Sequence, residues 1–407
     1  MKKPRLLIED WLPAAAIGVE CMRERGSASA LAPTTYLHVW WARRPLVVSR
    51  AAVLGSLLPA DFPHEVFERL VGFGRSGQEL VKIRQVMDTG KRIEGGFGCD
   101  RAFKRPMRED DLAKAHAAAA RLFGKDIAVI DPMAGGGSIP LESARLGFRT
   151  LANEYNPVAC TVLEATVDYP FRFDGKLAER TRHWAKEWLT RAEKRLGPFF
   201  PKRKDGLVHA YIFARTVPCP DTEGHPPTPL VPDWHLLKPK DSAVRVWAEP
   251  IVDKKTGKWS VRIVDNREQK ARSKTPPAPT YGAGKGISLF SGQQIADDWI
   301  KAQAQAGNMR SALYAVAVKG PRGLKFEPPG EADLQALEKA EKELSKHRKR
   351  WEQENIIPTE LYPEVTTDER PRTYGMPRWA DMFAPRQLLG FGVLVEELHA
   401  LRSEIVK

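Results

Sequence analysis

The sequence lacks several features that would assign it to a familiar class of protein. Its four cysteines form no C-x-x-C pair, which argues against a disulfide scaffold and fits a reducing compartment. No run of about 18 apolar residues is present, so no membrane span is expected. The basic N-terminus does not resemble a signal peptide, because Glu9 and Asp10 interrupt its apolar stretch. We therefore expect a cytoplasmic protein with no membrane contact.

What is present is a long, basic chain. Its 407 residues leave room for two or three domains and a sizeable core. The formal net charge of +13 favours a polyanionic partner, although many basic proteins bind no nucleic acid.

One stretch organises the rest of the sequence. The apolar run 127–130 predicts a buried parallel strand, and the apolar spacing from Ile139 to Leu146 predicts a helix that stops at Gly147. Between them lies a glycine-rich turn, in which we expect Ser138 to cap the helix. Its residues are Asp131, Pro132, Met133, Ala134, Gly135, Gly136, Gly137 and Ser138. Such a turn lets a ligand approach the backbone and the free N–H groups of a helix start.

A second strand, Phe148 to Asn153, ends at Glu154, near the ~20-residue distance of a nucleoside-binding βαβ unit. A carboxylate there can accept hydrogen bonds from ribose hydroxyls. The turn lacks the G-x-G-x-x-G spacing and the P-loop lysine, and Asp131 would repel a pyrophosphate. A cationic nucleoside such as S-adenosylmethionine suits it better. The alternative is an ordinary strand-to-helix turn in an enzyme of another class.

These motifs resemble those of the DUF1156 family of adenine-specific DNA methylases, many of which carry a zinc ribbon. The resemblance lies in DPMAGGGSIPLESARLG and NEYNPVA, and it implies that Glu154, Tyr155 and Asn156 lie at the cofactor. The string HVWWARRPL resembles the family's N-terminal signature. On that basis we assign His38, Trp40, Arg43 and Arg44 to the lining of the cofactor site, against the alternative of a helix start with solvated arginines.

The resemblance implies an α/β fold with a partial Rossmann-like sheet of the class I methyltransferase kind. We expect a helical region over 1–115, a cofactor-binding βαβ core over 116–200, a β-rich insertion over 205–330 and helices over 331–407. Hairpins are expected around 253–258 and 320–323, with a mobile loop over 267–286. Relatives place their zinc ribbon near this insertion. Here Cys219 and His225 are the only nearby candidates, so we expect no metal.

No [Asp/Asn/Ser]-Pro-Pro-[aromatic] loop is present, although adenine-N6 transfer needs one to hold the flipped base. We therefore assign no catalytic residue. The sequence predicts the cofactor-binding part of an adenine-specific DNA methyltransferase tied to restriction or phage defence, with DNA and a second polypeptide as partners. The alternatives are a non-catalytic nucleic-acid-binding subunit, a truncated remnant, or a methyltransferase acting on RNA or a small molecule.

Overall fold

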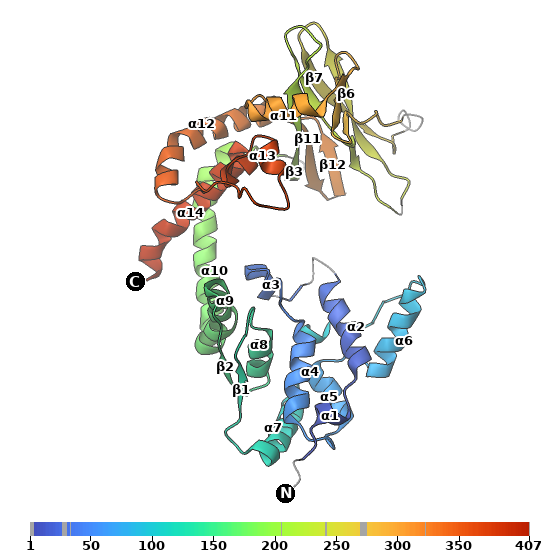
Figure 1. Ribbon diagram of the computed structural model, residues 1–407, viewed down its shortest axis with the longest axis vertical. Helices are drawn as coiled ribbons and strands as arrows, with labels where there is room; N and C mark the ends of the chain where they lie inside the picture. Colours follow the sequence, from blue (N-terminus) through green and yellow to red (C-terminus); the bar gives the residue numbers. More distant parts are fainter. Residues whose placement is uncertain are drawn as a thin grey trace. The chain divides into compact units, whose positions relative to one another are not determined.

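The computed structural model describes residues 4–26, 31–32, 34–204, 206–240, 242–268, 275–321 and 323–406. The chain has a mixed α/β fold and divides into two compact units, Met1–Arg182 and His183–Lys407 (Figure 1). Each unit has its own core, and each is described by itself below.

The first part of unit 1 is helical, as the sequence predicts. Its elements are α1 (Leu7–Asp10), α2 (Ala14–Arg25), α3 (Thr34–Leu37), α4 (Leu46–Leu57), α5 (His64–Val71), α6 (Gly77–Asp88), η2 (Ala102–Lys104) and α7 (Glu109–Phe123). Helix α4 is the most apolar of these and supplies Val47, Ala51 and Leu54 to the core. Phe67 and Leu70 of α5 are also fully buried there.

The start of α4 depends on a side chain from another helix. A proline suits the first turn of a helix, and the sequence predicts Pro45 there. Pro45 occupies the cap position instead, and it offers no side-chain acceptor. The carboxylate of Glu24, on α2, accepts hydrogen bonds from Leu46 N at 3.0 and 2.8 Å and from Val47 N at 3.4 Å. Because these N–H groups have no partner within their own helix, Glu24 satisfies what the local sequence leaves open.

The glycine-rich turn joins a parallel strand pair, as predicted. β1 (Ala128–Asp131) pairs with β2 (Arg149–Ala152) in a two-stranded sheet, and α8 (Ser138–Arg145) connects them. Thr150 Oγ1 donates to Ser143 Oγ of α8 at 3.0 Å, so α8 covers one face of the pair. On the other face Ile130 and Leu151 lie opposite each other and are 66% and 45% exposed. The expectation that this first strand is buried is therefore wrong, because only the α8 side of the pair is covered.

A long helical run follows β2. It comprises α9 (Pro157–Leu163), the π-helical segment η3 (Glu164–Asp168) and α10 (Tyr169–Leu196). Asp174 interrupts α10 with φ 53° and ψ −150°. The helical spacing of the sequence predicts Leu189 in the buried stripe of this helix, but Leu189 is 50% exposed, whereas Ala192 is buried.

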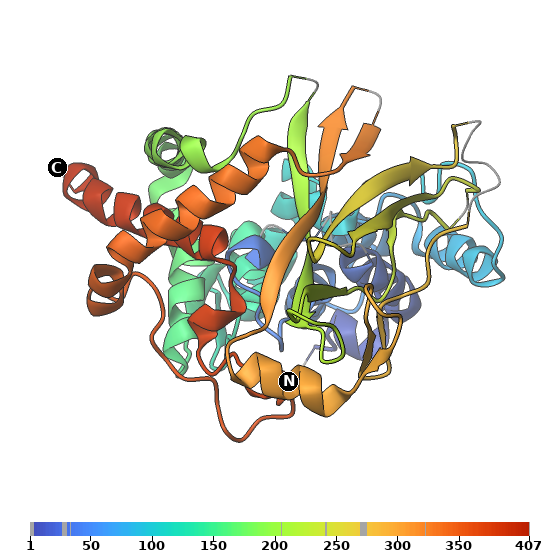
Figure 2. The ribbon, with the colours of Figure 1, turned by 90° about the horizontal axis from the view of Figure 1, so that it is seen from above.

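Unit 2 contains the β-rich part of the chain. Its first sheet has the order β12-β11-β3-β4, the second β5-β6-β7 and the third β10-β9-β8. Figure 2 shows β3 and β11, which pair antiparallel along most of their lengths, side by side. The strands are β3 (Leu207–Pro218), β4 (Pro227–Leu230), β5 (His235–Leu237), β6 (Val246–Asp253), β7 (Lys258–Asp265), β8 (Tyr281–Gly282), β9 (Lys285–Ile287), β10 (Gln294–Ile295), β11 (Arg310–Gly320) and β12 (Gly323–Glu327).

Both predicted hairpins are confirmed, since Asp253 pairs with Lys258 and Gly320 with Gly323. The loop expected over 267–286 is wrong at its end, because β8 and the first residues of β9 lie there. Residues 269–274 of that loop and residue 322 of the second hairpin lie outside the described residues.

Helices complete unit 2: η4 (Gly197–Phe199), α11 (Asp297–Gln305), α12 (Glu331–Gln353), α13 (Arg370–Thr373), η6 (Trp379–Met382) and α14 (Pro385–Ile405). The sequence spacing predicts Leu334, Leu337 and Leu344 on one side of α12. Leu344 is buried, but Leu334 is 41% exposed, and the buried side also carries Ala336, Ala340 and Trp351. Gly392 of α14 lets the two helices approach, because a Cβ there would lie 2.2 Å from the Trp351 ring.

Glu396 of α14 joins three helices. Its carboxylate bonds to Arg195 at 2.6 Å, to Arg350, and to Trp351 Nε1 at 3.2 Å. Burial raises the pKa of this carboxyl, but the hydrogen bonds from Arg195, Arg350 and Trp351 outweigh burial and bring the pKa to about 2. Glu396 is therefore ionised throughout the neutral range.

Candidate functional site

The glycine-rich turn is held by backbone hydrogen bonds to the end of β2. Ala134 N donates to Asn153 O at 3.0 Å, and Asn153 N donates to Asp131 O at 2.9 Å. The Asp131 carboxylate accepts from Met133 N at 3.2 Å. Gly135 and Gly137 have φ angles of 53° and 79°, a region that favours glycine. The turn therefore has a defined shape without any ligand.

Protein side chains approach all three glycines. A Cβ on Gly135 would lie 2.8 Å from Trp40 Nε1, and a Cβ on Gly136 would lie 3.0 Å from Trp40 Cβ. On Gly137 it would lie 2.7 Å from Leu163 Cδ2. Packing alone thus requires a side-chain-free backbone here, in addition to the predicted reason of ligand approach.

Glu154 lies directly at this turn. Its Oε2 accepts a hydrogen bond from Gly135 N at 2.7 Å, and its Oε1 accepts from Tyr155 N at 2.8 Å and from Asn156 N at 3.0 Å. Bonds from the N–H groups of Asn156, Gly135 and Tyr155 lower the pKa of this carboxyl below its ordinary value. A carboxylate offers about four acceptor positions, so one remains on Oε2.

Ser138 and Asn156 both lie at helix starts near the turn, but only Asn156 caps its helix. Ser138 was expected to cap α8, but this expectation is wrong: Gly137 occupies the cap, and Ser138 Oγ donates to Arg44 O at 2.8 Å. Asn156 is a true cap, because its Oδ1 accepts from Val158 N at 2.9 Å and Ala159 N at 3.4 Å at the start of α9. Asn156 therefore fixes the direction in which α9 leaves Glu154.

The structure brings only part of the HVWWARRPL stretch to the turn. Trp40 packs on Gly135 and Gly136 and stacks on the exposed Trp41 with ring centroids 4.5 Å apart. The ring centroid of His38 lies 6.3 Å from that of Trp40.

The Arg43 side chain bonds away from the turn, and Arg44 reaches the turn through its backbone. The Arg43 guanidinium bonds to Thr34 Oγ1 at 2.9 Å and to Glu24 at 3.4 Å. Arg44 contributes its backbone carbonyl to Ser138. Among the remaining turn residues, Met133 is 85% exposed and Pro132 is exposed, whereas Ala134 is buried; Tyr155 is 98% exposed.

A cavity of about 780 Å³ adjoins Glu154. Residues of β2, α8, α9, η3 and α10 line it, among them Asn153, Glu154, Leu163, Val167 and Phe171. Its volume falls in the range of small-molecule sites. The sequence analysis missed the last three residues, although their spacing of four is the signal of one helical face.

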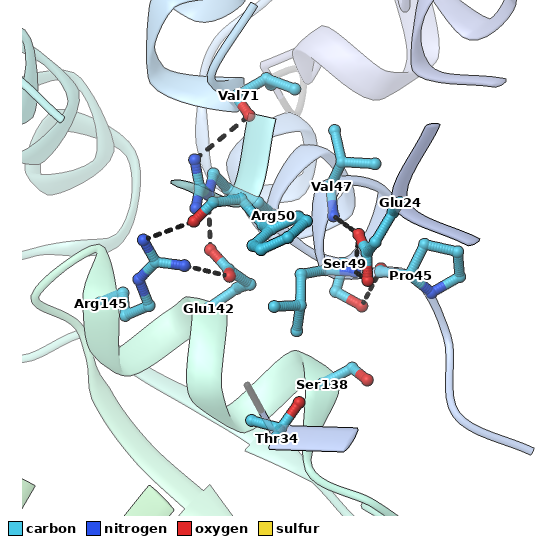
Figure 3. A network of polar contacts seen from close by, with 12 residues as sticks. Glu24, Thr34, Pro45, Val47, Ser49, Arg50, Val71, Ser138, Glu142 and Arg145 are labelled. Carbon is cyan, nitrogen blue, oxygen red and sulfur yellow. Dashed lines mark hydrogen bonds and ion pairs between the residues drawn. The ribbon is translucent and has the colours of Figure 1, made fainter. Parts of the chain in front are cut away.

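A buried ion cluster joins α4 to α8 (Figure 3). Arg50 is fully buried, and its Nε donates to Glu142 Oε2 at 2.5 Å while its Nη1 donates to Val71 O at 3.2 Å. Arg145 Nη1 donates to the other Glu142 oxygen at 2.7 Å. This cluster, the Arg50 cluster, fixes the helix that follows the glycine turn against the helical region before it.

The expected zinc-ribbon position has ordinary protein contacts. Cys219 Sγ lies 3.1 Å from Ser288 Oγ, and His225 Nδ1 lies 2.7 Å from Cys219 O. Over the described residues, no group of three or more His, Cys, Asp or Glu side chains is arranged to hold a metal ion.

Comparison with family models gives one match. Residues 11–70 match the model described as "Protein of unknown function (DUF1156)". The match confirms the predicted resemblance to this family, and it includes α4 and Arg50. Comparisons with curated proteins and with solved structures find no match. In the part of the chain that the structure describes, every helix is too short or too polar to cross a membrane.

Proposed function

We propose that this chain is the S-adenosylmethionine-binding part of an adenine-N6-specific DNA methyltransferase. The observation that carries the proposal is the parallel β1–α8–β2 unit, in which an ionised carboxylate at the end of β2 meets a glycine turn at the end of β1. We interpret this unit as part of a Rossmann-like sheet, in which nucleosides bind at the carboxyl ends of parallel strands.

The residues of the turn fit such a nucleoside. The remaining acceptor position on Glu154 Oε2 can take one ribose hydroxyl, and a second hydroxyl would replace one of the three backbone donors. Asp131 adds negative charge that suits the ammonium and sulfonium of the cofactor. The cavity beside Glu154 has room for the base. When bound, S-adenosylmethionine supplies an electrophilic methyl group.

Trp40 supports the turn in this proposal. Its indole lies against Gly135 and Gly136, so it holds the backbone that faces the ligand. Trp40→Ala is expected to weaken binding. Tighter binding by this variant would show instead that the indole blocks the site.

The proposal includes DNA and a second polypeptide as partners. Strands of a parallel sheet are normally covered on both faces, but Ile130 and Leu151 are exposed on the face that α8 leaves open. Further strands and a covering layer from a partner chain, together with the base-binding loop, would complete the enzyme. The proposal extends to a role in restriction or phage defence, which the resemblance to the family implies.

Calorimetry with S-adenosylmethionine tests the cofactor site. The whole chain should bind, and Glu154→Ala should weaken binding about tenfold or more, since a charge-assisted hydrogen bond to the ribose is lost. Glu179→Ala, an exposed acid on α10, is the matched control and should bind as the wild type does. Equal affinities of the Glu154 variant and the control would contradict the proposal.

The second candidate is a non-catalytic nucleic-acid-binding subunit. Two observations favour it over the first candidate: Gly136 and Gly137 are already buried, and Glu154 already accepts three backbone hydrogen bonds. DNA binding by a chain that does not bind S-adenosylmethionine would support this candidate and exclude the first.

A further inference from the structure

A second cavity, of about 310 Å³, lies wholly within unit 2. It is formed where β3, β11 and α12 meet the segment 374–388. Three arginines line it: Arg215 from β3, Arg310 from β11 and Arg348 from α12. We call this cavity the arginine pocket.

The positive charge of the arginine pocket is only partly compensated, because one of its three arginines forms an ion pair. The Arg215 guanidinium donates to two neutral atoms, Ser311 Oγ at 3.2 Å and Met376 Sδ at 3.6 Å. For Arg310, no ion pair is formed with any of the described residues. Arg348 forms an ion pair with Glu352, with its Nε 2.9 Å from the carboxylate, so its charge is compensated, and its two Nη groups take no part in that pair.

Asp381 is the one carboxylate among the described lining residues, and it is already engaged. Its Oδ2 accepts from Arg378 N at 2.9 Å, at the start of η6. With Asp381 in the lining and Glu352 paired to Arg348, the three guanidinium groups retain a net positive charge, an arrangement that favours an anion. Arginine donates several hydrogen bonds from one plane and matches the oxygens of phosphate.

The wall of the pocket is preformed. Gly375 has φ 74°, and a Cβ there would lie 2.1 Å from Ala304 O, so the backbone at 374–376 is pressed against the end of α11. Tyr374 is tied to Asp297 of α11 by a hydrogen bond of 3.4 Å. These contacts place Met376, the partner of Arg215, without help from a ligand.

We propose that the arginine pocket binds a phosphate group of a nucleic-acid strand. The volume lies at the lower end of ligand sites and suits a phosphate with part of its sugar, not a base pair. The pocket belongs to unit 2 and uses none of the residues assigned to the cofactor. The proposal of phosphate binding can therefore be tested independently of S-adenosylmethionine binding.

Fluorescence anisotropy with a short labelled DNA strand tests the proposal on the whole chain. Arg215→Gln and Arg310→Gln should each weaken binding about tenfold and reduce the salt dependence by about one phosphate contact. Arg262→Gln removes the same charge from β7, in another sheet, and should change the affinity by less than about twofold. Equal losses in all three variants, or no loss in the pocket variants, would overturn the proposal.

Competition with inorganic phosphate distinguishes the phosphate of a nucleic-acid strand from free phosphate as the ligand of the pocket. Displacement of the strand only at high phosphate concentration assigns the site to nucleic acid. Tight phosphate binding that depends on Arg215, with DNA binding unaffected by the variants, overturns the nucleic-acid assignment.

A measurement on the wild-type protein tests the proposal without depending on whether the variants fold. Phenylglyoxal modifies accessible arginines, and mass spectrometry identifies each modified position. The DNA strand should slow the modification of Arg215 and Arg310 severalfold and leave Arg262 unchanged. Unchanged rates at Arg215 and Arg310 would refute the proposal even if every variant failed to fold.

Discussion

Replacement of Arg50 by methionine should destabilise unit 1 strongly. Arg50 is fully buried, and its loss leaves the Glu142 carboxylate in the core with only Arg145, whose side chain is 28% exposed. Removing one partner of a buried ion pair costs about 3–5 kcal/mol. The carbonyls of Leu70 and Val71 lose a donor as well. We expect a loss near the upper part of that range.

The double replacement Arg50→Met with Glu142→Leu distinguishes the cost of an unpaired buried charge from the loss of packing around it. It removes both charges and fills the space with apolar atoms, so it should recover at least half of the lost stability. Arg84→Met on α6 is the control, because Arg84 and Asp88 form a partly exposed pair worth about 0.3–0.5 kcal/mol.

Urea unfolding of the whole chain measures these differences, and hydrogen exchange assigns them to α4 and α8. The reasoning also predicts faster exchange in the glycine turn, because α8 begins there. An Arg50→Met variant within about 1 kcal/mol of the Arg84→Met control would refute the energetic role of the Arg50 cluster.

Three further outcomes are expected. The pKa of Glu396 in the folded protein, about 2, lies below the ordinary value of 4.5, so the stabilisation from this carboxylate is present above pH 4.5 and is lost as the pH falls toward 2. Urea unfolding at acid and neutral pH should show that the free energy of unfolding falls by about 1–2 kcal/mol at acid pH, and Glu396→Gln should abolish this difference. Gly392→Ala should lower the melting temperature, because its Cβ overlaps Trp351, whereas Gly390→Ala in the same helix meets open space and should raise it slightly; equal shifts would contradict the packing argument. Asn156→Ala should cost about 1 kcal/mol and speed exchange in the first turn of α9, and unchanged exchange would show that the cap is dispensable.

The order strand, glycine turn, helix, strand could be predicted from the sequence because its signals are local. An apolar run marks β1, helical spacing marks α8, and Gly135 and Gly137 mark backbone that other residues rarely adopt. The position of Glu154 at the turn follows from the length of the unit.

The predictions that were wrong concern residues whose contact partners lie far away in the sequence. Ser138 does not cap α8 because the carbonyl of Arg44, 94 residues earlier, accepts its hydroxyl hydrogen bond. Arg43 bonds to Glu24 and Thr34, which no periodicity reveals. The covering of Gly135 by Trp40 is likewise a contact between segments far apart in the chain.

The dependence of α4 on Glu24 has a consequence for the order of folding events. Because the first N–H groups of α4 find their acceptor on α2, a peptide containing α4 alone would fray at its beginning. Closing the 22-residue separation between Glu24 and Leu46 must accompany the completion of that first turn. We therefore expect the first turn of α4 to form together with its docking on α2, and a Glu24→Gln variant should slow folding in stopped-flow measurements.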